Sequence, residues 1–200
     1  MNHRNVYVAN RVTQAMRELP RDHFIEMSDP SLLVGRIIPP TNAISEILQH
    51  AAIMPEHNVL LIGTGAGYMA ALTSKLASQV VALEVDNTLA HEAQLRFNEL
   101  GLCNLVQRTC DGTAGAADLG PYDRILVSTA QIDDKSALIA QLADGGRLLA
   151  LEHAEVDSQI LTRYEISELG ATLRRELAMV DFSRDAGMTL LDMGMVDQVM

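Results

Sequence analysis

The sequence predicts an α/β protein with a doubly wound, mostly parallel sheet and a C-terminal antiparallel strand pair. Short runs of branched aliphatic residues alternate with helical patterns between residues 59 and 151. The glycine-rich stretch VLLIGTGAGY, residues 59–68, directly follows the first of these runs. After residue 157 the apolar and polar residues alternate with a period near two. Strands that alternate with helices form a parallel sheet covered on both faces, so the predicted core is Rossmann-like.

Each element follows from a local pattern. Apolar residues at helical spacing predict helices over 5–19, which Pro20 ends, and over 41–53, and the stretch between them, 20–40, is predicted to be loop-rich. Strands are predicted over 59–62, 80–84, 104–110, 123–128 and 147–151, helices over 68–77, 88–100 and 135–142, and the antiparallel pair over 158–167 and 172–183. We expect a single domain over 1–200, with N-terminal helices and a loop (1–55), a Rossmann-like core (56–155) and the C-terminal strands (156–200).

Composition and charge exclude several function classes. The chain has 26 acidic against 15 basic residues and a formal net charge of −11. This balance opposes nonspecific binding to nucleic acid or to anionic membranes, and the sequence contains no Trp to stack on bases. The only adjacent arginines, in LRRE at 173–176, are typical of a solvated face. No nucleic-acid or membrane partner is therefore expected.

The chain also lacks signals for export, membrane insertion and metal binding. Its apolar runs are strand-sized and its N-terminus is polar, so we expect a cytoplasmic protein. Cys103 and Cys110 lie seven residues apart, which fits reduced thiols and no zinc-type spacing. The six His residues show no clustered spacing, so no metal site is predicted. The oligomeric state stays open.

The glycine loop predicts a ligand site at the carboxyl ends of the strands. Gly63, Gly65 and Gly67 would let the backbone turn tightly and bring N–H groups near a ligand, although such turns also occur for packing alone. Glu84 ends the second strand, 19 residues after Gly65, where a carboxylate can accept the hydroxyls of a ribose. Asp111, in the CDG segment, can accept from an amine such as that of adenine.

Each acid also has an ordinary interpretation. Glu84 could be a solvated acid at a strand end, and Asp111 could be part of an Asp-Gly turn. Three strand ends that agree nevertheless favour an adenosine-containing ligand.

The spacing of the glycines discriminates among such ligands. A dinucleotide fingerprint reads G-x-G-x-x-G, whereas this loop reads G-x-G-x-G and has Tyr68 at the place of the last glycine. A P-loop requires GK followed by Ser or Thr, which is absent. The tighter spacing favours a ligand without phosphates, such as S-adenosylmethionine (SAM).

On these residues the chain resembles a class I SAM-dependent methyltransferase, and more narrowly the protein-L-isoaspartate O-methyltransferases. The resemblance rests on AMRELPRDHFI, VLLIGTGAGY, VVALEVD, CDG, PYDRILVSTA, LADGGRLLALE and SQILTRYEIS, in the order of the family. It implies methylation of the free carboxylate of L-isoaspartyl residues in damaged proteins, with SAM as the cofactor. It implies cofactor-binding residues at Gly63, Thr64, Gly65, Gly67, Tyr68, Glu84, Val85, Asp111 and Gly112.

The chain departs from the family at the reacting end of the site. Leu61 stands where the family has an acid, and Pro39-Pro40-Thr41 replaces a Ser-Gln-Pro segment that lines the substrate pocket. Thr41 is then the candidate for positioning the substrate. Leu151-Glu152-His153 replaces a Pro-Val-Gly run, and an ionised Glu152 that faced the pocket would repel a carboxylate substrate, whereas a Glu152 that faced solvent would not.

Three other functions stay open. The chain could be a diverged relative that binds SAM and methylates another acceptor. It could be a non-catalytic SAM-binding or interaction module that keeps the fold. An NAD-dependent oxidoreductase is disfavoured by the glycine spacing.

Overall fold

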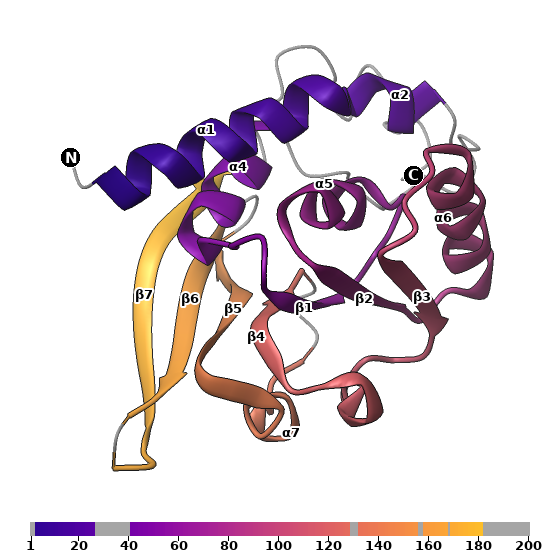
Figure 1. Ribbon diagram of the computed structural model, residues 1–200. Helices are drawn as coiled ribbons and strands as arrows, with labels where there is room; N and C mark the ends of the chain where they lie inside the picture. Colours follow the sequence, from indigo (N-terminus) through magenta and orange to yellow (C-terminus); the bar gives the residue numbers. More distant parts are fainter. Residues whose placement is uncertain (1–2, 27–40, 129–131, 156–157, 168, 182–200) are drawn as a thin grey trace, which may run out of the picture.

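A computed structural model describes residues 3–26, 41–128, 132–155, 158–167 and 169–181. Seven strands form one sheet in the order β3-β2-β1-β4-β5-β6-β7 (Figure 1). The strands are β1 (Asn58–Ile62), β2 (Gln79–Glu84), β3 (Leu105–Thr109), β4 (Tyr122–Val127), β5 (Leu142–Glu155), β6 (Ser158–Ile166) and β7 (Thr172–Asp181). The first five strands pair in parallel, whereas β6 and β7 add antiparallel. The predicted fold class is confirmed.

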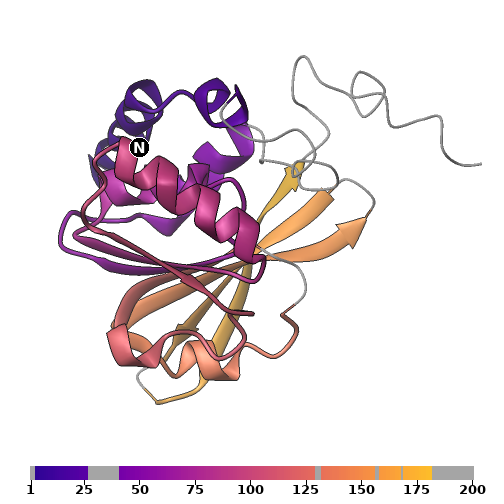
Figure 2. The ribbon, with the colours of Figure 1, turned by 90° about the vertical axis from the view of Figure 1, so that its right-hand side faces the viewer.

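Helices cover both faces of this sheet (Figure 2). They are α1 (His3–Glu18), α2 (Arg21–Glu26), α4 (Thr41–Ala51), α5 (Tyr68–Leu76), α6 (Asn87–Glu99), α7 (Ser136–Ile139) and the 3₁₀ turn η1 (Ala117–Leu119). Buried side chains from α1, α4, α5 and α6 pack on one face, and those near η1 and from α7 pack on the other. Successive strand residues alternate between the two cores, so Leu61 belongs to the first and Leu60 and Ile62 to the second.

The sequence analysis predicted a loop-rich segment after Pro20, but this segment begins with a short helix. Residues 21–26 form α2, and Phe24 on this helix is fully buried with its ring centroid 5.0 Å from that of Tyr68. A six-residue helix is too short to show a clear period, and burial of one aromatic side chain stabilises it. The rest of the predicted loop, 27–40, including Pro39 and Pro40, lies outside the described residues.

Two further boundaries were predicted wrongly. The helix expected over 135–142 spans only Ser136–Ile139, and β5 already begins at Leu142 rather than at Arg147. β5 is long because it pairs with β4 on one side and with β6 on the other. At its start, β5 pairs only with β4, through Tyr122 and Leu142, and a register shift precedes the pair Arg124–Arg147, so the predicted turn lies within the irregular part of the strand.

Helix α6 supports the glycine loop from below. Asp86 caps the helix by accepting from the N–H groups of Thr88 and Leu89 at 2.9 and 3.1 Å. Phe97 on this helix is fully buried, and a Cβ added to Gly67 would lie 2.9 Å from its ring. The packing of α6 on the sheet therefore determines how closely the loop approaches this helix.

This contact predicts the effect of Phe97→Ala. Truncation leaves a cavity beneath the loop and should lower the free energy of unfolding by about 3–5 kcal/mol in urea denaturation. Leu95→Ala on the exposed side of the same helix is the control and should change stability by less than about 1 kcal/mol. Equal losses in the two variants would contradict the packing role of Phe97.

Candidate functional site

The three glycines of the loop have left-handed backbones and serve different purposes. Gly63, Gly65 and Gly67 have φ values of +88°, +52° and +93°, which side chains disfavour. A Cβ at Gly67 would collide with Phe97, whereas a Cβ at Gly65 would meet nothing within 4 Å. Gly67 thus allows close packing, and Gly65 leaves an open face that a ligand can approach.

Glu84 joins the loop to the end of β2. Its side chain is only 5% exposed, and its carboxylate accepts from Gly65 N at 2.8 Å and from Asp86 N at 3.1 Å. Leu83 O accepts from the N–H groups of Gly63 and Thr64 at 2.9 and 3.2 Å. The end of β2 therefore holds the loop in place and keeps a carboxylate beside it.

The CDG segment lies at the same edge. Cys110 N donates to Glu84 O at 2.9 Å, which places Asp111 next to the end of β2. The Asp111 carboxylate is exposed, and hydrogen bonds from the hydroxyl and N–H of Thr113 lower its pKa. A Cβ at Gly112 would lie 2.4 Å from a methyl group of Ile62, so only glycine fits against the end of β1.

The side chains of Thr64 and Tyr68 stabilise the fold. The Thr64 hydroxyl donates to Leu83 O at 3.2 Å, and the Tyr68 ring is buried against Phe24, so that burial raises the pKa of its hydroxyl. Val85 differs, since its apolar side chain is 64% exposed directly after Glu84. Thr41 is the exposed first residue of α4, and within the described ranges no hydrogen bond joins it to the loop.

Two residues that the sequence analysis missed also hold the loop. The Ser128 hydroxyl, just after β4, lies 2.6 Å from Gly63 O and 2.8 Å from Ile62 O. The buried Arg96 of α6 donates to Ala66 O at 3.0 Å and pairs with Glu92 at 3.0 Å. The sequence shows an arginine within a predicted helix but does not show its burial, and its partner is thirty residues away in the sequence.

The position that the sequence analysis assigned to the reacting end of the site is apolar. Leu61 is fully buried in the core beneath α4 and α5. A hollow of about 10 Å³ in the same core is lined by Ile47, Met69, Leu126, Val127, Ser128, Leu149, Leu151 and Leu161. It has room for about one water molecule, so it is not a substrate pocket by itself.

Glu152 is partly buried, and its negative charge is paired. Its carboxylate lies 3.2 Å from Lys135 Nζ and 2.8 Å from Arg174 Nη2, and it accepts from the hydroxyls of Thr162 and Tyr164. Partial burial opposes its ionisation, but these hydrogen bonds outweigh burial and lower its pKa to about 2. The sequence analysis left open whether Glu152 faces the pocket or solvent and did not expect the two cations that compensate its negative charge. The side chain of His153 lies outside the described residues.

Metal-binding clusters and membrane-spanning helices are absent from the described residues. In the described ranges, no three His, Cys, Asp or Glu residues lie close enough to hold a metal ion. Both cysteines are free and exposed. None of the described helices is long and apolar enough to cross a membrane.

Comparison with known proteins identifies the relatives of this chain. Residues 1–184 match the profile described as protein-L-isoaspartate(D-aspartate) O-methyltransferase. A protein-L-isoaspartate O-methyltransferase of Xanthobacter autotrophicus is 36% identical over 180 residues, which cover 86% of this chain and 82% of the relative. One from Koribacter versatilis is 38% identical over 148 residues, which cover 70% of this chain and 67% of the relative.

Solved structures share the fold. A protein-L-isoaspartate O-methyltransferase superposes with a TM-score of 0.71 at 21% identity, over 88% of this chain and 61% of that one. This chain thus spans less than two thirds of that protein. A putative protein-L-isoaspartate O-methyltransferase of Plasmodium falciparum, in complex with S-adenosyl-L-homocysteine, superposes with a TM-score of 0.56 at 16% identity. The superposition covers 88% of this chain and 97% of that one.

The Glu152 cluster predicts a specific pH dependence of stability. A carboxyl group whose pKa is depressed by folding stabilises above its unfolded pKa, 4.5, and this contribution is lost as the pH falls toward 2. Glu152→Gln should therefore be less stable by about 1–2 kcal/mol at pH 7, after allowance for solvent screening, and nearly equal to the unaltered chain near pH 2. Urea denaturation across this range measures the difference.

Glu176→Gln is the matched control for this prediction. Glu176 is exposed and also pairs with Arg174, at 2.9 Å. Its replacement should leave the pH dependence close to that of the unaltered chain. A Glu152→Gln variant with the same difference at every pH would refute the pairing.

Proposed function

The chain belongs to the protein-L-isoaspartate O-methyltransferase family, and on that premise we propose that it methylates the free carboxylate of L-isoaspartyl residues in damaged proteins, with SAM as methyl donor. The observation that carries the proposal is the open face of Gly65 beside the Glu84 carboxylate, with the Asp111 carboxylate at the next strand end. These groups come from three neighbouring strand ends, where ligands of doubly wound sheets bind.

The residues at this edge suit the adenosine part of SAM. The Glu84 carboxylate accepts backbone N–H groups of the loop and of Asp86, and a carboxylate has acceptor sites for several donors, among which we propose a ribose hydroxyl. The exposed Val85 offers an apolar surface for a purine ring, and Asp111 an acceptor for its amine. The proposed cofactor-binding residues are Gly63, Thr64, Gly65, Gly67, Tyr68, Glu84, Val85, Asp111 and Gly112, of which Thr64 and Tyr68 would act through their backbone.

The chemistry requires positioning more than proton transfer. SAM supplies an electrophilic methyl group on a sulfonium, and a carboxylate acceptor is already ionised at pH 7. The protein must align the acceptor with the methyl group and avoid repelling its negative charge. Lys135 and Arg174 compensate Glu152, which removes one source of repulsion. Thr41 is the proposed positioning residue for the substrate.

Leu61 favours a second candidate, methylation of another acceptor. The family has an acid at this position, and here a fully buried leucine cannot make the corresponding polar contact. The adenosine side would be unchanged by this difference. The two candidates therefore predict the same SAM site and different methyl acceptors.

The acceptor is tested with a pair of peptides. An isoaspartyl peptide should take up labelled methyl from SAM, and its normal aspartyl twin should be labelled at least about 100-fold more slowly, a difference of about 3 kcal/mol in transition-state binding. Labelling of neither peptide by a chain that binds SAM would reject the repair function and leave the second candidate.

The role of the glycine loop is tested with Gly65→Val. A branched side chain would occupy the open face, so we expect SAM affinity measured by equilibrium dialysis to fall at least about 100-fold, or about 2.7 kcal/mol. Gly101→Val is the matched control, since Gly101 has φ +63° and also has nothing within 4 Å of its Cβ position. Both variants should lose about 1–3 kcal/mol of stability through backbone strain. Unchanged SAM affinity in Gly65→Val would show that the loop is structural only.

A further inference from the structure

Four arginines and one glutamate occupy neighbouring positions on strands β4 to β7. Arg124 of β4 lies opposite Arg147 of β5, and Arg147 lies opposite Glu165 of β6. Two residues before Glu165 on β6, Arg163 lies opposite Arg175 of β7. By the alternation of strand residues, this arginine row lies on the sheet face that α1 and α4 cover.

The arginine row carries more positive charge than its acid compensates. Glu165 is shared, with one oxygen 2.6 Å from Arg147 Nε and the other 3.2 Å from Arg163 Nη2. Two register pairs, Arg124–Arg147 and Arg163–Arg175, place like charges directly opposite each other, which destabilises a sheet. Such an excess is unexpected in a chain with a net charge of −11.

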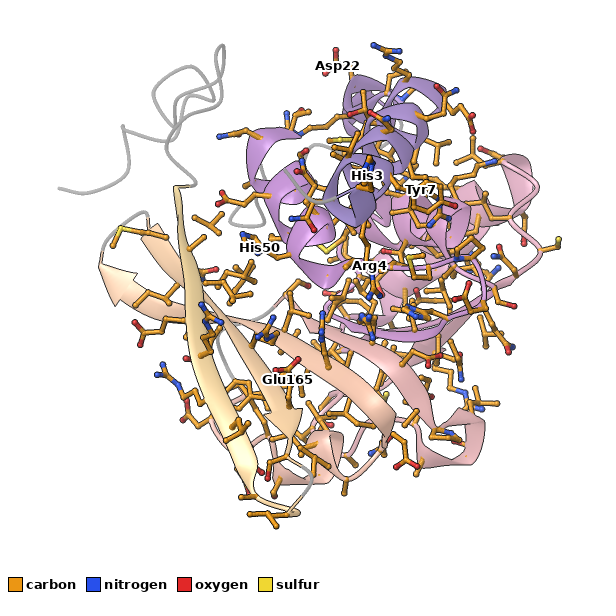
Figure 3. The ribbon with its side chains drawn as sticks, turned by 60° about the vertical axis from the view of Figure 1, so that its left-hand side comes forward. His3, Arg4, Tyr7, Asp22, His50 and Glu165 are labelled. Atoms are coloured by element: carbon orange, nitrogen blue, oxygen red, sulfur yellow. The ribbon has the colours of Figure 1, made fainter. Side chains whose placement is uncertain are left out.

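Helix α1 adds a further arginine above the row. Arg4 of α1 and His50 of α4 lie on the helical side of this region, and Glu165 lies below them on the sheet (Figure 3). Burial, then the charges of Arg147 and Arg4, lower the pKa of Arg124 to about 10, against the opposing effects of Asp123 and Glu165.

The nearby Asp123 is already engaged elsewhere. Its carboxylate accepts from the N–H of Asn58 at 2.8 Å. Asp123 and Glu165 favour the charged form of Arg124, but burial and the charges of Arg147 and Arg4 outweigh them.

Some of these arginines have donors available for a ligand. The Nε of Arg163 is buried and has no hydrogen-bond partner among the described residues, and Arg175 is exposed. Arg124 contributes its charge only, because its guanidinium already donates to the backbone oxygens of Ala51, Ala52 and Asp123. An unsatisfied buried donor beside like charges is the situation that an anion relieves.

We propose that the arginine row binds a phosphate-type oxyanion, with Arg163 and Arg175 as its direct ligands and Arg124 and Arg147 as the charges that attract it. Guanidinium groups match the oxygens of phosphate in geometry and charge. The row lies on the strands away from the glycine loop, which follows the carboxyl end of β1. This site is separate from the proposed methyl-transfer site and does not depend on it.

The first experiment measures thermal unfolding with different anions. At equal ionic strength, 10 mM inorganic phosphate should raise the melting temperature by about 3 °C relative to chloride. Glycerol 3-phosphate is the second arm. A similar shift shows that the row also accepts a phosphomonoester, and its absence restricts the ligand to the free ion. No shift with either compound would overturn the proposal.

Variants then locate the site. Arg175→Gln and Arg163→Gln should each remove at least half of the phosphate shift, whatever their melting temperatures in chloride. Lys75→Gln removes the same charge from an exposed position on α5 and should keep the full shift. If the two arginine variants respond to phosphate as the unaltered chain does, the anion does not bind at this row.

Discussion

The hydrogen bond from Gly65 N to Glu84 is the contact on which the candidate site depends. A loop of left-handed glycines has few side chains with which to fix itself, so its shape must be imposed from outside. Glu84 holds one N–H of the loop, Arg96 one carbonyl and Ser128 another. These three side chains come from β2, α6 and the end of β4, so the loop is in place only when the sheet and its helical layer are packed. Burying the Glu84 carboxylate is compensated by the backbone N–H groups that it accepts.

This arrangement separates the strand ends proposed to bind adenosine from the proposed reacting end of the site. The strand ends of β1, β2 and β3 meet at one edge and present an open backbone face, two carboxylates and one exposed valine. At the reacting end the chain is apolar at Leu61 and has a compensated charge at Glu152. A carboxylate acceptor that approaches this end meets neither a family acid at position 61 nor an isolated negative charge at 152. In the proposed function, the departures from the family therefore alter the polarity of the acceptor side and leave the residues proposed to bind adenosine unchanged.

The sequence predicts the sheet, the loop and the two acids because each rests on a local pattern. Branched aliphatic runs identify the strands, and strand order then brings Glu84 and Asp111 to the edge that carries Gly65. Arg96, Ser128 and the partners of Glu152 could not be found in this way, because their contacts join segments far apart in the chain. The short α2 was missed for a different reason. It depends on the burial of Phe24 against Tyr68, which periodicity does not show.

The central claim is that this edge of the sheet binds the adenosine part of SAM. Hydrogen exchange measured by mass spectrometry, with and without S-adenosylhomocysteine, tests it most directly because it reports both binding and location. The account predicts slower exchange in peptides that contain residues 63–68, 84–86 and 111–113, and little change over β6 and β7. Unchanged exchange in these three segments at saturating ligand, or protection confined to other parts of the chain, would contradict it.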